Sequence, residues 1–180
     1  MNSRAAGFSL IELVVTLVIV GILLGVALPS YSAYLQNAKI RTAASSVQTG
    51  LQLARTQAIL LNLPVDFTRT SATGAGWSVG LQSAAVCPIA VLPNCPLIES
   101  KSNQEGGIQE VEVGGSTLTV SFNGFGQNTT GATTITFENS IGGVCAPGGP
   151  MRCLNVVIAP GGQARICDPA VVDVNDSRHC

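Results

Sequence analysis

The side chains that could carry out chemistry in this sequence are one isolated carboxylate near the start and six cysteines in the second half. Glu12 is the single ionisable residue between Phe8 and Leu28. His179, the only histidine, is next to last, and no cysteine pair has C-x-x-C spacing, so a zinc site would lack its usual ligands. No Ser/His/Asp site, Cys/His site or phosphate loop can be assembled. The sequence therefore predicts no catalytic residues, no metal and no cofactor, and a protein that is not an enzyme.

The cysteines favour disulfide bonds in an oxidising compartment, because all of them lie after residue 80 and none lies in the apolar head. They are Cys87, Cys95, Cys145, Cys153, Cys167 and Cys180. The sequence does not fix their connectivity. Closure of short loops suggests the pairs Cys87–Cys95, Cys145–Cys153 and Cys167–Cys180, each typically worth about 2–4 kcal/mol of stability.

Residues 8–28 form an apolar run that is long enough to cross a bilayer as a helix. A cleavable secretory signal or an ordinary single-pass anchor would show a similar run. Neither explains Glu12, because a carboxylate in hydrocarbon costs about 2.5–3.5 kcal/mol and usually faces a partner.

Residues 7–13, Gly-Phe-Ser-Leu-Ile-Glu-Leu, closely resemble the processing site of type IV prepilins and type II secretion pseudopilins. The resemblance implies that prepilin peptidase cleaves after Gly7 and methylates the new N-terminus at Phe8. It also implies that Glu12 accepts the positive N-terminus of a neighbouring subunit during assembly. Such a pair would offset much of the cost of burying both charges.

With this resemblance, we expect four segments along the chain: a leader at residues 1–7, a transmembrane helix at 8–28, a periplasmic amphipathic helix at 29–63 and a β-rich globular pilin domain with disulfides at 64–180. Apolar residues of the second segment of helix recur at spacings of three and four and face a core: Val47, Leu51, Ala54, Ala58 and Leu61.

Seven short β-like runs follow Pro64, separated by Gly, Asn and Pro. They are Val65–Thr70, Gly76–Gln82, Ile108–Val113, Leu118–Phe122, Thr133–Glu138, Cys153–Ile158 and Ala164–Cys167. No helical pattern of the length that parallel crossovers need lies between them. The predicted fold is α+β, with a long N-terminal helix packed on a small antiparallel sheet or sandwich.

The residues of the tail add a second resemblance. Residues 122–126 (Phe-Asn-Gly-Phe-Gly) and 154–168 look like the soluble part of the GspH/FimT family of minor pilins and pseudopilins. The resemblance implies a pilin-like fold, partnership with other pilins through the N-terminal helix, and a single-pass inner-membrane protein with a periplasmic domain. The implied function is to assemble into or prime a type IV pilus or a type II secretion pseudopilus.

An alternative function is DNA binding for uptake, because some FimT-type pilins hold DNA through a Gly-Arg-x-Arg motif. Residues 162–165 here read Gly-Gln-Ala-Arg, so one arginine is replaced by a glutamine that releases no counterions. The candidate DNA-binding residues are Arg152, Gln163, Arg165 and Arg178. Acids lie close in sequence at Asp168, Asp173 and Asp176. The competing interpretation is a solvated loop in which Arg165 pairs with Asp168.

Overall fold

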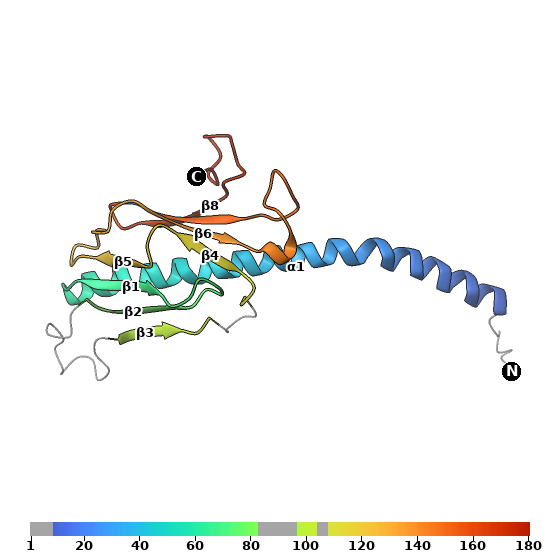
Figure 1. Cartoon of the computed structure of the whole chain (residues 1–180), viewed down its shortest axis with the longest axis horizontal. Coiled ribbons are helices and arrows are strands. Elements are labelled where there is room, and N and C mark those ends of the chain that lie inside the picture. Colours follow the sequence, from blue (N-terminus) through green and yellow to red (C-terminus); the bar gives the residue numbers. More distant parts are fainter. Residues whose placement is uncertain (1–8, 83–96, 104–107) are drawn as a thin grey trace, which may run out of the picture.

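The long N-terminal helix is the axis of the molecule. The computed structural model describes residues 9–82, 97–103 and 108–180, and side chains of residues 26–30 are not described. Helix α1 (Leu10–Leu61) begins at the N-cap Ser9 and ends at Asn62, whose left-handed backbone lets its N–H bond the carbonyls of Ala58 and Ile59. Figure 1 shows the first half of α1 extending away from the domain and the second half packed along it.

Two antiparallel sheets of four strands pack with the second half of α1. The first sheet has the order β3-β2-β1-β5, with bounds β1 Val65–Arg69, β2 Trp77–Leu81, β3 Leu97–Lys101 and β5 Thr119–Phe122. The second has the order β4-β6-β7-β8, with bounds β4 Glu112–Gly115, β6 Thr133–Glu138, β7 Leu154–Ile158 and β8 Ala164–Cys167. A short 3-10 helix, η3, covers Ser140–Gly142. The α+β fold predicted from the sequence is confirmed.

The core lies where α1 meets the sheets. The buried hydrophobic residues of the helix are Ile40, Ala43, Ala44, Val47, Leu51, Ala54 and Ala58. Strands β1, β2 and β6 alternate buried and half-buried residues, as expected of strands with one face on a core. The indole N–H of Trp77 donates to the hydroxyl of Ser46 on α1 at 3.2 Å, so the one tryptophan is both packed and hydrogen-bonded.

The strand predictions differ from the structure at two places. Leu97–Lys101 is an edge strand that the sequence reading missed, because its residues are mostly exposed and so show no alternation. The predicted strand Ile108–Val113 begins only at Glu112. Ile108 and Val111 are buried, but they belong to a turn in which the Val111 N–H bonds the Ile108 carbonyl at 2.9 Å.

No helical stretch within the described residues is both long enough and apolar enough to cross a membrane.

Candidate functional site

The start of α1 is the first place where a sequence-predicted site residue can be located. Glu12 lies in the first turn and is exposed, and its N–H donates to the hydroxyl of the N-cap Ser9 at 3.3 Å. A carboxylate here is favoured by the positive end of the helix dipole. The predicted processing residues Gly7 and Phe8 lie outside the described residues, so cleavage, methylation and the pairing of Glu12 stay predictions.

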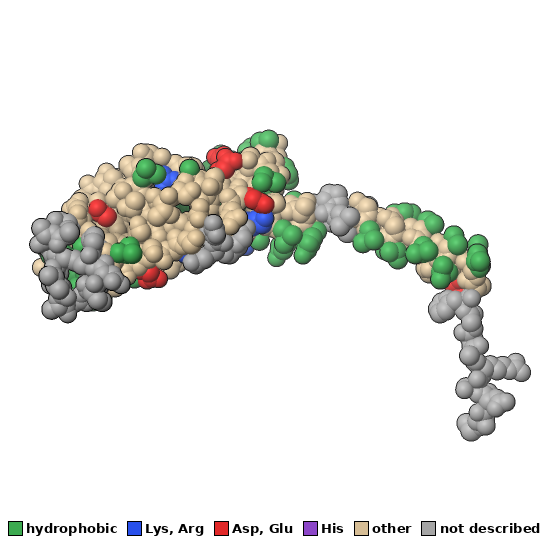
Figure 2. Space-filling view, turned by 60° about the horizontal axis from the view of Figure 1, so that its bottom comes forward, with side chains coloured by type: hydrophobic (Ala, Val, Ile, Leu, Met, Phe, Trp, Pro, Cys, Tyr) green, Lys and Arg blue, Asp and Glu red, His purple; other side chains and the backbone are tan. Residues whose placement is uncertain are grey.

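The apolar half of α1 leaves large hydrophobic side chains uncovered. Leu10, Ile11, Leu17, Ile22 and Leu23 are each more than 60% exposed. Figure 2 shows hydrophobic side chains, in green, along the part of the helix that projects from the domain. Exposed apolar surface of this extent on a helix indicates contact with other helices or with lipid.

A second feature of α1 is a line of exposed, uncharged residues that continues along the half of the helix packed on the domain. We call it the α1 seam: Tyr31, Leu35, Ala38, Thr42, Ser45, Thr49, Gln52, Thr56 and Ile59. Its members alternate at spacings of four and three, which is the spacing of a helix-packing stripe. Some of the helix residues between them, such as Ile40, Val47 and Leu51, are buried in the core, whereas Arg41 is exposed. The seam was not predicted from the sequence, because its Ala, Ser and Thr residues have low hydropathy. The recurrence of Thr42, Thr49 and Thr56 at seven-residue intervals was the signal that could have identified it.

The hydroxyl groups of the seam's threonines donate to backbone carbonyls within the helix. Thr42 donates to the Ala38 carbonyl at 2.9 Å, Thr49 to Ser45 at 2.9 Å and Thr56 to Gln52 at 2.8 Å. Because each of these hydroxyl groups already donates to a carbonyl of the helix, none of them needs a water molecule as its acceptor. A partner helix could therefore cover these residues without leaving an unpaired polar hydrogen.

The arginines considered for DNA do not form one cationic patch. Arg152 lies 3.4 Å from the nearly buried carboxylate of Asp168, and Arg178 lies 2.6 Å from Asp176. Arg165 donates to the backbone oxygens of His179 at 2.9 Å and Cys180 at 3.2 Å. The expected pairing of Arg165 with Asp168 is therefore wrong, because the returning C-terminal tail occupies Arg165 and Arg152 takes the carboxylate.

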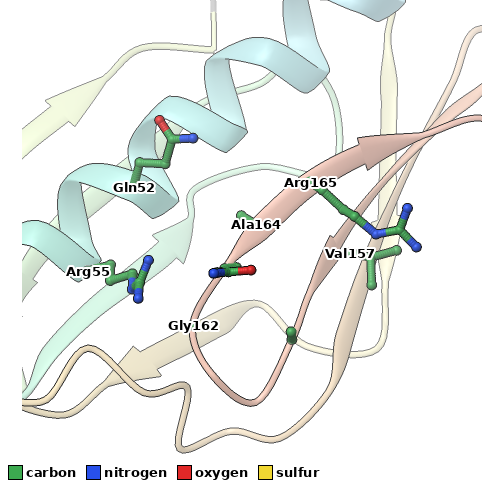
Figure 3. Close-up of a pocket in the computed structure, with 8 residues that line it drawn as sticks. Gln52, Arg55, Val157, Gly162, Ala164 and Arg165 are labelled. Atoms are coloured by element: carbon green, nitrogen blue, oxygen red, sulfur yellow. The ribbon is translucent and has the colours of Figure 1, made fainter. Parts of the chain in front are cut away.

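The four candidate DNA-binding residues also line two different surface clefts. Gln163 and Arg165 border a shallow cleft of about 380 Å³ between α1 and the turn before β8, together with Gln52 and Arg55. In Figure 3 the guanidinium groups of Arg55 and Arg165 lie on opposite sides of this turn. Arg152 and Arg178 border a separate groove. The arrangement gives the DNA alternative no support.

The two described disulfides match the short-loop expectation. Cys145 is bonded to Cys153 and Cys167 to Cys180. Cys87 and Cys95 lie outside the described residues, so their pairing stays a prediction.

Two family models match the chain. The model described as "Type II transport protein GspH" matches residues 43–162, and the "Prokaryotic N-terminal methylation motif" matches residues 2–28. No curated protein matches in sequence.

Two solved structures are similar in fold, both crystal forms of the type IV minor pilin FimU of Pseudomonas aeruginosa strain PAO1. One is 12% identical, with a TM-score of 0.55, over 74% of this chain and 91% of that one. The other is 13% identical, with a TM-score of 0.50, over 70% and 90%. At this identity the similarity concerns the fold.

Proposed function

Because the chain belongs to the type IV pilin-like GspH family, we propose that it is a membrane-anchored minor pilin or pseudopilin that assembles into or primes a filament, either a type IV pilus or a type II secretion pseudopilus. Its action is structural and not enzymatic. Residues 1–7 are the leader that prepilin peptidase removes, and residues 8–28 hold the subunit in the inner membrane with its domain in the periplasm. The methylation-motif match at residues 2–28 supports this division.

The observation that carries the proposal is the α1 seam together with the exposed apolar side chains of the first half of α1. The apolar first half of α1 and the α1 seam together give one helix that can pack against other helices from Leu10 to Ile59. Residues in a seven-residue repeat drift by about 20° per repeat on a straight helix, so a partner helix would wind along the seam with a left-handed twist. In the filament, contacts with neighbouring helices would replace the contacts that the exposed residues of α1 make with lipid and water in the free subunit.

Glu12 has a specific place in this assembly. Cleavage after Gly7 leaves an ammonium group on Phe8, four residues before the carboxylate of Glu12. Pairing of the carboxylate with the N-terminus of a neighbouring subunit compensates both charges in the bundle. Glu12→Ala should therefore reduce incorporation into filaments while membrane insertion continues.

The experiment that tests the proposal places a charge in the α1 seam. Thr56→Glu puts a carboxylate at an exposed seam position and should reduce the amount of protein in sheared filaments about tenfold or more, by the cost of an unpaired charge at an interface. Ser116→Glu adds the same charge on an exposed turn outside α1 and should leave incorporation unchanged. Equal incorporation of the two variants, at equal membrane levels, would contradict the role of the seam.

A further inference from the structure

The C-terminal tail, residues 168–180, contains a short motif that filament assembly does not use. Residues 173–177 read Asp-Val-Asn-Asp-Ser. Asn175 has a hydroxyl residue, Ser177, two positions on, with no proline between them. This is the Asn-x-Ser/Thr sequon, which accepts N-linked sugars and is found in surface loops of exported proteins. The motif therefore identifies Asn175 as a candidate modification site, provided that an enzyme can reach it.

The structure places the acceptor residues at the surface of the tail. Asn175 and Ser177 are both exposed. Asn175 lies in a turn that is closed by the Asp176 N–H, which donates to the Asp173 carbonyl at 3.0 Å. Figure 1 shows the tail as a loop that stands out beyond β8. An enzyme can therefore approach the asparagine from solvent.

The carboxamide of Asn175 is held by exposed hydrogen bonds. Its nitrogen donates to the Asp173 carboxylate at 3.2 Å, and the backbone N–H of Asn175 donates to the same oxygen at 2.9 Å. Water competes for groups at such a surface, so the polar groups of an enzyme can take over both bonds at little cost. The amide nitrogen is thus available to a transferase.

A second sequon in the chain provides a comparison. Asn128 is followed by Thr129 and Thr130. Asn128 is only 6% exposed, its carboxamide nitrogen donates to the Gly131 carbonyl, and its carboxamide oxygen accepts from the Thr130 N–H at 2.9 Å. A buried amide with both of its polar atoms bonded is part of the folded structure. The same motif is therefore accessible at Asn175 and blocked at Asn128.

The tail can bind an enzyme while the domain stays folded. Among the described residues that form the hydrophobic core, none comes from residues 169–180. Val172 and Val174 are 88% and 75% exposed. The disulfide between Cys167 and Cys180 keeps both ends of the tail at β8. The residues between these cysteines can therefore change conformation in an enzyme's cleft without uncovering the core.

The tail begins on the side of the domain from which the N-terminal half of α1 projects. Asp168 pairs with Arg152 at 3.4 Å, and the Arg152 N–H donates to the Asn37 side chain at 2.6 Å. Asn37 follows residue 28, the end of the proposed transmembrane segment, by nine residues, or about 14 Å along a helix. The tail therefore starts close to the membrane surface, where a lipid-linked sugar donor is held.

We propose that Asn175 accepts an N-linked oligosaccharide from a polyprenyl diphosphate carrier in the membrane. The transfer forms a bond between Nδ2 of Asn175 and C1 of the first sugar, and it breaks the bond between this C1 and the diphosphate oxygen. The diphosphate leaves with the electron pair of that bond, and a base of the transferase takes one amide proton. The sugar makes the tail bulkier and more hydrophilic. The inference rests on the proposed function only in placing the domain outside the cytoplasm, at the membrane.

Mass spectrometry of the chain purified from the membranes of cells that naturally make it tests the inference. After reduction, trypsin releases residues 166–178 with Asn175, and residues 102–152 with Asn128. The first peptide should be heavier by the mass of an oligosaccharide, and fragmentation should place the sugar on Asn175. The second peptide should keep its unmodified mass. An unmodified first peptide, or a sugar on Asn128 instead, overturns the inference.

Substitutions within the motif separate transfer to the amide from attachment to the neighbouring hydroxyl. Ser177→Ala keeps Asn175 but removes the hydroxyl of the sequon, so the added mass should be lost. Ser177→Thr keeps the sequon and is the matched control, in which the sugar should remain on Asn175. Asn175→Gln should also lose it. A sugar that persists in Asn175→Gln or in Ser177→Ala is attached by a different reaction and overturns the inference.

Filaments from the same cells separate this inference from the proposed function. A chain that is present in filaments but has no sugar on residues 166–178 overturns the inference and leaves the proposed function standing. A chain that carries the sugar, in cells whose filaments form without it, contradicts the proposed function and supports the inference.

Discussion

An ion pair between two residues close in sequence, Asp176 and Arg178, lies in the C-terminal tail. Arg178 donates from two guanidinium nitrogens to the Asp176 carboxylate and also donates its backbone N–H to it. The side-chain hydrogen bond from Arg178, with its backbone bond and charge, lowers the pKa of Asp176 from 3.8 to about 2. The same pair raises the pKa of Arg178. Both residues are therefore charged at neutral pH.

A single substitution should reverse this shift. Arg178→Ala should raise the pKa of Asp176 from about 2 towards its ordinary value, because the carboxylate loses its main donor. The folded pKa is depressed, so the stability that the pair contributes is complete above the ordinary pKa and is lost as the pH falls towards 2. A carboxyl titration by NMR measures the midpoint. In the control Arg41→Ala the midpoint should stay low; an unchanged midpoint in Arg178→Ala would show that another group holds the pKa down.

At the scale of elements, close approach of α1 to the first sheet depends on one glycine. A Cβ on Gly50 would lie 2.7 Å from a ring carbon of Phe67 and 2.8 Å from two ring carbons of Trp77. The two rings pack with centroids 6.1 Å apart. They fill the space beside α1 that a larger residue at this position would need.

Gly50→Ala should therefore destabilise the domain although alanine favours helix. Overpacking of a core costs about 1–3 kcal/mol, against a gain of at most ~1 kcal/mol in helix propensity. Denaturant unfolding followed by the fluorescence of Trp77, the only tryptophan, measures the difference. Gly161→Ala is the control, because nothing lies within 4 Å of its added Cβ. If Gly50→Ala were as stable as this control, the packing described for α1 would be wrong.

A buried arginine connects the two sheets. Arg69 at the end of β1 is 6% exposed and donates to the carbonyls of Val113 at 2.7 Å and Thr117 at 2.8 Å. Burial lowers the pKa of Arg69. Val113 lies on β4 of the second sheet and Thr117 in the β4–β5 connection, so the guanidinium group links β1 of the first sheet to the edge strand of the second.

At the scale of the whole molecule, the chain end folds back on the second sheet. The disulfide Cys167–Cys180 closes this tail, and the Asp168 N–H donates to the Arg178 carbonyl at 2.7 Å. Arg165 on β8 donates to the backbone oxygens of the last two residues. The tail is thus held at both of its ends, and it contributes Arg178 to the groove that Arg152 also borders.

The double variant Cys167→Ala/Cys180→Ser should release the tail while α1 and both sheets stay folded. Loss of the bridge should cost about 2–4 kcal/mol, and limited proteolysis should cut within residues 169–179. Cys145→Ala/Cys153→Ala removes the other described disulfide and should leave these residues protected. A tail that resists protease in the first variant would mean that Arg165 and Asp168 hold it without the bridge.

Local patterns in the sequence predicted the fold well. The four-and-three spacing of Val47, Leu51, Ala54 and Ala58 identified the core face of α1, and these residues are buried. Alternation identified the central strands, because each has one face on the core. In the edge strand Leu97–Lys101 only Ile98 is a hydrophobic residue packed against the core, so alternation could not identify this strand.

The sequence by itself determined the long helix and the β-rich domain, and closure of short loops suggested the two described disulfides, Cys145–Cys153 and Cys167–Cys180, since each of these features depends on residues near one another in the chain. Only the tertiary structure decided the partners of the arginines. Arg69 bonds residues 44 and 48 positions away, and Arg152 takes the carboxylate expected for Arg165. The physical reason is that a hydrogen bond or ion pair depends on distance in space, which the packing of sheets and tail sets and sequence separation does not.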